Sequence, residues 1–214
     1  MRRPDARARP LPLAAIGALA WLFAAPAAQA HLVTTGLGPL YDGVGHFLLS
    51  PEDVVSVLAM GLFAGQRGPA AGRIVIFAVP AAWLAAGLMG FCIEAAPLFS
   101  QPQTAAAIAV TLLVPGLLIA SNRFSSRSTV LLVTVLFSGL HGLLDGVSQR
   151  RADSLAASLT LAGIAASVFT LVVLSSAFVV SLRIPWTQIA VRVAGSWIAA
   201  TGLLLLGWSI RRMG

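Results

Sequence analysis

The chain has 214 residues, of which 58% are hydrophobic and only 10% are charged, and its mean hydropathy is +0.91. A soluble domain usually carries about 25% charged residues, so a chain this apolar has too little polar surface to cover itself in water. Its net charge of +7 comes from arginines that lie mostly beside apolar segments, without the basic stripe that binds nucleic acid. The composition indicates a membrane protein and argues against a nucleic-acid partner.

Residues 1–30 have the pattern of a cleavable secretory signal peptide. Four arginines within residues 2–9 precede an apolar run over residues 11–25, and Ala28-Gln29-Ala30 forms a small-x-small cleavage site. We predict that cleavage after Ala30 leaves residues 31–214 as the membrane domain, beginning with His31 outside the cytoplasmic membrane. A free α-amine beside an imidazole can chelate a transition metal, so His31 is a candidate metal ligand. The alternative is an uncleaved first helix.

Six apolar segments follow the signal peptide. In lipid, only helices and closed barrels satisfy every backbone hydrogen bond, and these segments are about 20 residues long without alternation of apolar and polar residues. We therefore predict an all-α, polytopic transmembrane helix bundle. Pro51 lies inside the first span and marks a break or a helix start there. The expected spans are residues 40–66, 74–93, 104–120, 129–147, 155–182 and 189–210.

The arginines indicate the orientation of the spans. A cleaved signal places the start of the first span outside, so the arginines of residues 67–73 and 123–127, with Arg183 and Arg192, fall inside, as the positive-inside rule requires. The pairs at 150–151 and 211–212 fall outside and run against the rule. We predict a multi-pass protein of the cytoplasmic membrane, held by the lipid bilayer, with a non-cytoplasmic N-terminus.

The few ionisable residues of the spans gather toward the non-cytoplasmic side of this topology. Four of them lie in the leading part of the first span, and two lie in the last third of the fourth span. Ionisable groups in a membrane are costly and usually face a partner or a cavity, and imidazole with carboxylate suits a divalent transition metal. With the N-terminal histidine, the candidate metal ligands are His31, Asp42, His46, Glu52, Asp53, His141 and Asp145.

The spacing of these residues predicts how they meet. Asp42 and His46 are four residues apart, as are His141 and Asp145, so each pair shares one helix face. Glycines at 139, 142 and 146 surround the second pair, and glycines let membrane helices approach closely. We therefore expect the fourth span to pack against the first and to join the two pairs.

Other interpretations of the same residues stay open. Asp42 is also typical of a turn, and Glu52 with Asp53 is typical of an acidic first helical turn after Ser50 as N-cap. His141 is compatible with an interhelical hydrogen bond, or with Asp145 as the group that orients it. The five tryptophans are interpreted as packing residues and interface anchors.

Two sequence segments, together with the signal peptide that ends before a histidine, resemble the HupE/UreJ family. The first is HFLLSPED at residues 46–53, followed by LAMGL at 58–62; the family has His-Pro, then Asp-His, then an apolar stretch leading to Gly-Leu there. The second is FSGLHG at residues 137–142, which is similar to Phe-x-x-x-His-Gly in a later family helix. The resemblance implies a membrane protein that supplies nickel to hydrogenase or urease.

Residue by residue, the resemblance implies roles for four positions. His46 matches the first family histidine, Glu52 stands at the aspartate, Asp53 stands at the second histidine, and His141 matches the histidine of the later helix. Phe47 replaces the proline, and the histidine-rich stretch that often follows His-Gly is absent. Fewer nitrogen donors make the site harder, which leaves manganese, cobalt, iron and zinc open besides nickel.

We therefore expect a secondary transporter for uptake of a divalent transition-metal ion such as nickel or cobalt. The ion is its substrate rather than a permanent cofactor, and because no GxxxxGK[ST] motif occurs, an ion or potential gradient would drive it. The first alternative is a non-transporting accessory protein that delivers metal to, or helps assemble, a metalloenzyme maturation system. The second is an intramembrane hydrolase using Ser138, His141 and Asp145, although its GxSxG motif is absent and we do not expect an enzyme.

Overall fold

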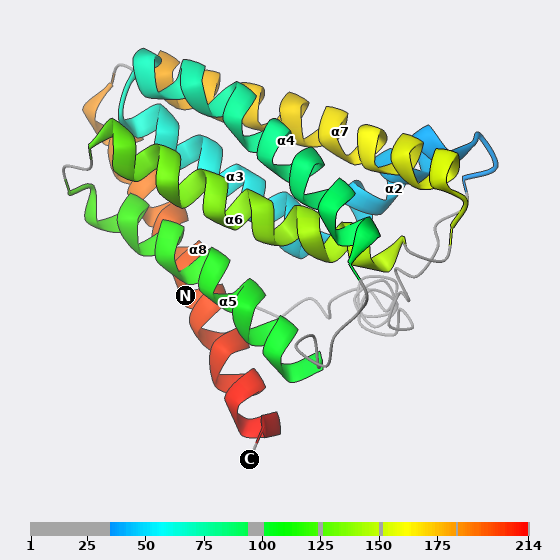
Figure 1. Cartoon of the computed structure of the whole chain (residues 1–214). Coiled ribbons are helices and arrows are strands. Elements are labelled where there is room, and N and C mark those ends of the chain that lie inside the picture. Colours follow the sequence, from blue (N-terminus) through cyan, green and yellow to red (C-terminus); the bar gives the residue numbers. More distant parts are fainter. Residues whose placement is uncertain (1–34, 94–100, 124–125, 150–151, 183, 214) are drawn as a thin grey trace, which may run out of the picture. The chain divides into compact units, whose positions relative to one another are not determined.

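The computed structural model describes residues 35–93, 101–123, 126–149, 152–182 and 184–213. The predicted signal peptide and His31 lie outside these residues. The described part is entirely helical, which confirms the predicted all-α bundle (Figure 1). Its helices are α2 (Pro39–Leu49), α3 (Pro51–Gln66), α4 (Pro69–Cys92), α5 (Gln101–Ser121), α6 (Arg127–Ser148), α7 (Ser154–Ser181) and α8 (Pro185–Met213).

Five of these helices, α4 to α8, are long and apolar enough to cross a membrane alone. The two shorter helices, α2 and α3, meet this test only as a pair, and the pair is bent by 78°. Counted as one broken span, the pair brings the bundle to the six spans that the sequence predicts.

The break lies at Ser50 and Pro51, as the sequence predicts. Proline lacks an N–H and disfavours a helical residue before it, and Ser50 accordingly has an extended backbone with φ −97° and ψ 90°. The Ser50 N–H bonds the carbonyl of Phe47, and its Oγ donates to the carbonyl of His46 over 2.9 Å. Ser50 thereby closes α2 while its own carbonyl accepts the N–H of Asp53 in the first turn of α3.

Helices α2 and α3 contact α7 near its opposite ends. Gly43 of α2 packs against the backbone of Thr160, and Gly65 of α3 packs against Val179. Thr160 and Val179 lie about 28 Å apart along α7 at 1.5 Å per residue, close to the thickness of a bilayer core. The pair therefore continues across the bundle instead of returning to its starting side.

Helix α6 lies lengthwise against α4, and the two run in the same direction (Figure 1). A Cβ at Gly142 would collide with the backbone carbonyl of Trp83, and one at Gly146 would collide with that of Gly87. We expected these glycines to pack against the first span, and that expectation is wrong. Both helices of the α4–α6 pair present glycines at the same level, so their backbones fit together more closely than either fits the broken pair.

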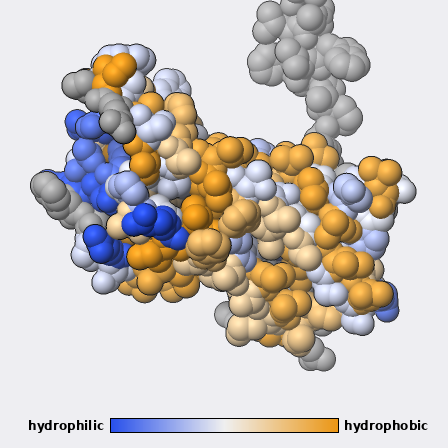
Figure 2. All heavy atoms as spheres, turned by 90° about the horizontal axis from the view of Figure 1, so that it is seen from above, coloured by the Kyte–Doolittle hydropathy of each residue, from blue (hydrophilic) through white to orange (hydrophobic). Residues whose placement is uncertain are grey.

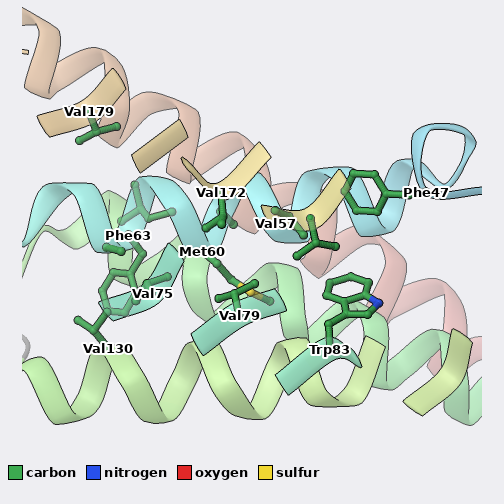
Figure 3. Close-up of a cluster of buried hydrophobic side chains, with 14 of the residues drawn as sticks. Phe47, Val57, Met60, Phe63, Val75, Val79, Trp83, Val130, Val172 and Val179 are labelled. Atoms are coloured by element: carbon green, nitrogen blue, oxygen red, sulfur yellow. The ribbon is translucent and has the colours of Figure 1, made fainter. Parts of the chain in front are cut away.

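The buried apolar residues form one core that lies mainly between α2, α3, α4, α6 and α7, with Ile119 of α5 and Val191 of α8 at its border (Figure 3). Its fully buried members include Met60, Phe63, Val79 and Trp83. Helices α5 and α8 form a second close pair, and α8 leaves large apolar residues such as Trp197 and Leu204 exposed, as lipid contact requires.

Arginines gather at one end of the bundle, where α3 and α5 end and where α4 and α6 begin. Arg67 donates from Nη1 to Asn122 over 3.1 Å, and Arg192 donates from Nε to the carbonyl of Ala120 over 2.9 Å. Partial burial lowers the pKa of Arg67. We call this end of the bundle the arginine end.

Hydrophilic residues are concentrated at one end of the face in Figure 2, while apolar residues cover most of the remainder.

Candidate metal centre

Two histidine–carboxylate pairs join the broken span to α6. The Nε2–H of His46, in the last turn of α2, donates to Oδ1 of Asp145 over 3.2 Å. The Nδ1–H of His141 donates to Oδ1 of Asp53, in the first turn of α3, over 2.6 Å. Each side thus contributes one imidazole and one carboxylate. The first and fourth spans meet through these side chains, as the sequence predicts, although their backbones do not pack lengthwise.

Three of these residues have the geometry of a metal site. His46, Asp53 and Asp145 each offer one ligand atom, and the three atoms lie within 4.8 Å of one another. Ligand atoms around a first-row ion with bonds of about 2.0–2.2 Å have separations within this limit. Two carboxylates balance the charge of a divalent cation. The donor set of one nitrogen and two oxygens suits ions between the soft and the hard classes.

Both ring nitrogens of His141 already have hydrogen-bond partners. Its Nδ1 faces Asp53, and its Nε2 lies 3.0 Å from the hydroxyl of Ser56 and 2.9 Å from that of Thr111. Thr111 already donates its hydroxyl proton to the carbonyl of Ile108 over 2.7 Å, which leaves the hydroxyl of Ser56 to donate to Nε2 of His141. His141 therefore orients Asp53 in this arrangement and offers no free nitrogen to an ion.

Trp83 closes the site on the side of α4. Its indole N–H donates to Oδ2 of Asp145 over 2.7 Å, and its ring stacks on His141 with 5.2 Å between centroids and 28° between planes. Phe47 packs edge-on against the same indole at 6.2 Å, and Figure 3 shows the indole nitrogen turned away from Met60 and Val79. From the sequence alone, Trp83 is interpreted as a packing residue or an interface anchor. Its position in the middle of a span, far from either interface, was the available indication of another role.

The remaining candidates lie elsewhere. Asp42 accepts hydrogen bonds from the N–H and the hydroxyl of Thr35, over 2.5 and 2.7 Å, and so fastens the start of α2. Glu52 is half-buried and lies outside the three-residue cluster. His31 lies outside the described residues. The structure thus brings together His46, Asp53, His141 and Asp145, and it does not bring Asp42 or Glu52 to them.

A comparison with family models bears on this arrangement. The model described as HupE / UreJ protein matches residues 19–205, which include every helix of the cluster. The chain belongs to the HupE/UreJ family. HupE/UreJ proteins are associated with nickel or cobalt transport, or with metal delivery for urease and hydrogenase, and the family and the apolar helices together identify a membrane protein. No match was found among curated proteins or among solved structures.

The cluster of His46, Asp53 and Asp145 differs in its residue types from the HupE/UreJ pattern. The family pattern expects a carboxylate at position 52 and an imidazole at position 53, whereas the buried cluster residue here is the carboxylate of Asp53. Asp145 lies in the stretch where HupE/UreJ proteins often carry histidines. Oxygen donors therefore occupy two of the three cluster positions.

The hydrolase alternative finds little support in the described structure. Ser138 donates its hydroxyl to the carbonyl of Thr134 over 2.5 Å, back onto its own helix and away from His141. Ser56, His141 and Asp53 do form a serine–histidine–carboxylate chain. Ser56 is 0% exposed, however, so no substrate can approach its hydroxyl in this conformation.

Proposed function

We propose that this protein is a secondary transporter that takes up a divalent transition-metal ion, such as nickel or cobalt, across the cytoplasmic membrane. The observation that carries the proposal is the cluster of His46, Asp53 and Asp145, whose ligand atoms lie within 4.8 Å at the break of a membrane span. Ionisable groups held at such a break are typical of substrate sites in transporters with discontinuous helices.

The depth of the cluster indicates how an ion would enter. Asp145 lies about 5 Å, and His141 about 10 Å, from the end of α6 at Ser148, at 1.5 Å per residue. This end is opposite to the arginine end, and Asp53 and Asp145 of the cluster offer an incoming cation two carboxylates there. If the arginines face the cytoplasm, the ion enters from the non-cytoplasmic side.

Binding would replace the hydrogen bond between His46 and Asp145 by two bonds to the ion, with the Nε2 proton of His46 released or transferred to Nδ1 so that Nε2 can ligate. His46 belongs to α2 and Asp53 to α3, so an ion held by both would draw the two halves of the broken span together. A membrane potential favours inward movement of a divalent cation by about 4.6 kcal/mol per 100 mV, twice the value for one charge. A potential is therefore a sufficient energy source for uptake.

Metal storage or delivery without transport is the second candidate, and one observation favours it. A cavity of about 210 Å³ opens at the arginine end and is lined by Gln66, Asn122 and Gln188, among others. None of its lining residues belongs to the metal cluster, and the buried side chains of Met60 and Phe63 occupy the core of α3 between the two. Transport requires this barrier to open, whereas storage does not.

Ion flux into proteoliposomes separates the two candidates. Purified protein is reconstituted with a metal-sensitive dye inside the vesicles, and nickel, cobalt, zinc, manganese and iron are offered outside. Transport predicts saturable flux for the wild type and none for an Asp53→Asn, Asp145→Asn double variant, with Asp42→Asn as the charge-matched control. Stoichiometric metal binding without flux would overturn transport and favour delivery.

A further inference from the structure

Trp83 is held more firmly than a packing residue requires. Its side chain is 0% exposed, its ring packs against both His141 and Phe47, and a Cβ at Gly142 of α6 would collide with its backbone carbonyl. The indole N–H donates to Oδ2 of Asp145 over 2.7 Å.

Because of this hydrogen bond, the two oxygens of Asp145 have different partners. Oδ2 accepts from Trp83, and Oδ1 lies 3.2 Å from Nε2 of His46, on the side of the metal cluster. A carboxylate that donates one oxygen to an ion and accepts a hydrogen bond on the other is held as a one-oxygen ligand. Calcium takes six to eight oxygens, often through both oxygens of a carboxylate, whereas small first-row ions accept fewer ligands at shorter distances.

We propose that Trp83 is a positioning residue that fixes Asp145 as a one-oxygen ligand and thereby makes the site select small transition-metal ions over larger oxygen-seeking cations. The inference rests on the proposed function, because it assumes that the cluster binds the transported ion. Trp83 touches no ion itself, and it acts through Asp145.

The test replaces Trp83 by phenylalanine, which keeps a ring against His141 and removes the N–H. Binding of cobalt, nickel and calcium to the purified full chain is measured by titration calorimetry, with Trp197→Phe as the control because Trp197 is 73% exposed on α8. Loss of a hydrogen-bond partner behind a metal ligand typically lowers affinity roughly 10- to 100-fold. We expect Trp83→Phe to lose cobalt and nickel affinity in that range while calcium affinity holds or rises, so that the selectivity ratio falls.

A double-variant cycle shows whether the effect passes through Asp145. In the Asp145→Ala background, Trp83→Phe should cause little further loss of cobalt affinity, because the acceptor of the hydrogen bond is already absent. Equal losses in both backgrounds would overturn the proposal, as would a uniform loss for all three ions, which a purely structural role predicts.

A measurement without any change at Trp83 guards against a variant that fails to fold. The other tryptophans are Trp21, Trp186, Trp197 and Trp208, and their replacement by phenylalanine leaves Trp83 as the single tryptophan. Cobalt should then quench the remaining fluorescence in a saturable way, and Asp145→Ala, which removes the acceptor of the indole N–H, should shift the unliganded emission spectrum. An unshifted spectrum would overturn the hydrogen bond and the proposal with it.

Wild-type protein that binds no metal would overturn the site and the proposed function together, whereas metal binding with unchanged selectivity in Trp83→Phe would overturn the Trp83 proposal alone.

Discussion

The imidazole of His46 and the carboxylate of Asp145 are 99 positions apart in the sequence, and their Nε2 and Oδ1 atoms lie 3.2 Å apart. The contact exists because Pro51 ends α2 just after His46, and because glycines of α6 let that helix lie directly on α4. With Asp53 at the start of the next half-helix, the same break supplies the third ligand atom of the cluster.

Asp145→Asn tests this contact by removing one charge with little change in volume. We expect cobalt or nickel affinity to fall by more than the roughly 10- to 100-fold typical of an outer hydrogen-bond partner, because a direct ligand charge is lost. Titration calorimetry on the purified protein measures the loss. Asp42→Asn should bind as the wild type does, since Asp42 bonds Thr35, and an equal loss in both variants would contradict the assignment.

His141→Ala should act mainly on stability. The variant leaves the buried carboxylate of Asp53 without its partner, and breaking one side of a buried ion pair costs about 3–5 kcal/mol. Thermal unfolding in detergent should show a clear fall in Tm even without metal. A wild-type Tm combined with complete loss of metal binding would instead identify His141 as a direct ligand.

Much of this arrangement follows from the sequence. Hydropathy predicts the six spans, Pro51 predicts the break, and the four-residue spacing of His141 and Asp145 predicts that both face one neighbour. The sequence does not predict which helices lie side by side. Gly142 and Gly146 pack against α4, and the spacing of residues along the chain does not distinguish α4 from the other helices as their partner.

The roles of Asp53 and Trp83 could not be predicted for the same reason, because both depend on how the helices pack. Glu52 and Asp53 are adjacent carboxylates, and the angle at the break decides which one is buried in the cluster. In the sequence, Trp83 is one of many apolar residues of its span. Only the structure shows that Asp145 of α6 lies at hydrogen-bond distance from it. The sequence leaves both Glu52 and Asp53 as candidate ligands, and it gives Trp83 only the general interpretation of a packing residue or interface anchor.

Gly142→Ala tests the close approach of α4 and α6. A Cβ there would collide with the backbone carbonyl of Trp83, and overpacking of this kind costs about 1–3 kcal/mol or more. We expect a lower Tm and weaker metal binding, because both Trp83 and His141 must shift. Gly139→Ala is the matched control, since its Cβ would meet only the Cβ of Ala86 at 3.9 Å. Equal tolerance of both alanines would contradict the close helix contact.

Ser138→Ala separates the transporter from the hydrolase alternative. The hydroxyl of Ser138 bonds the carbonyl of Thr134 within α6, so its removal should leave metal binding and flux unchanged. Proteoliposome flux measures the effect. Abolished function in a variant that keeps its wild-type Tm would contradict the account and return Ser138 to consideration as a nucleophile.

We infer that His46, Asp53 and Asp145 hold the ion together. X-ray absorption spectroscopy on the cobalt- or nickel-loaded protein examines this ligand set itself, because imidazole scattering counts the histidine ligands. We expect one imidazole and otherwise oxygen donors, with the imidazole signal absent in His46→Ala. Two or more imidazoles, or an imidazole signal that persists in His46→Ala, would contradict it.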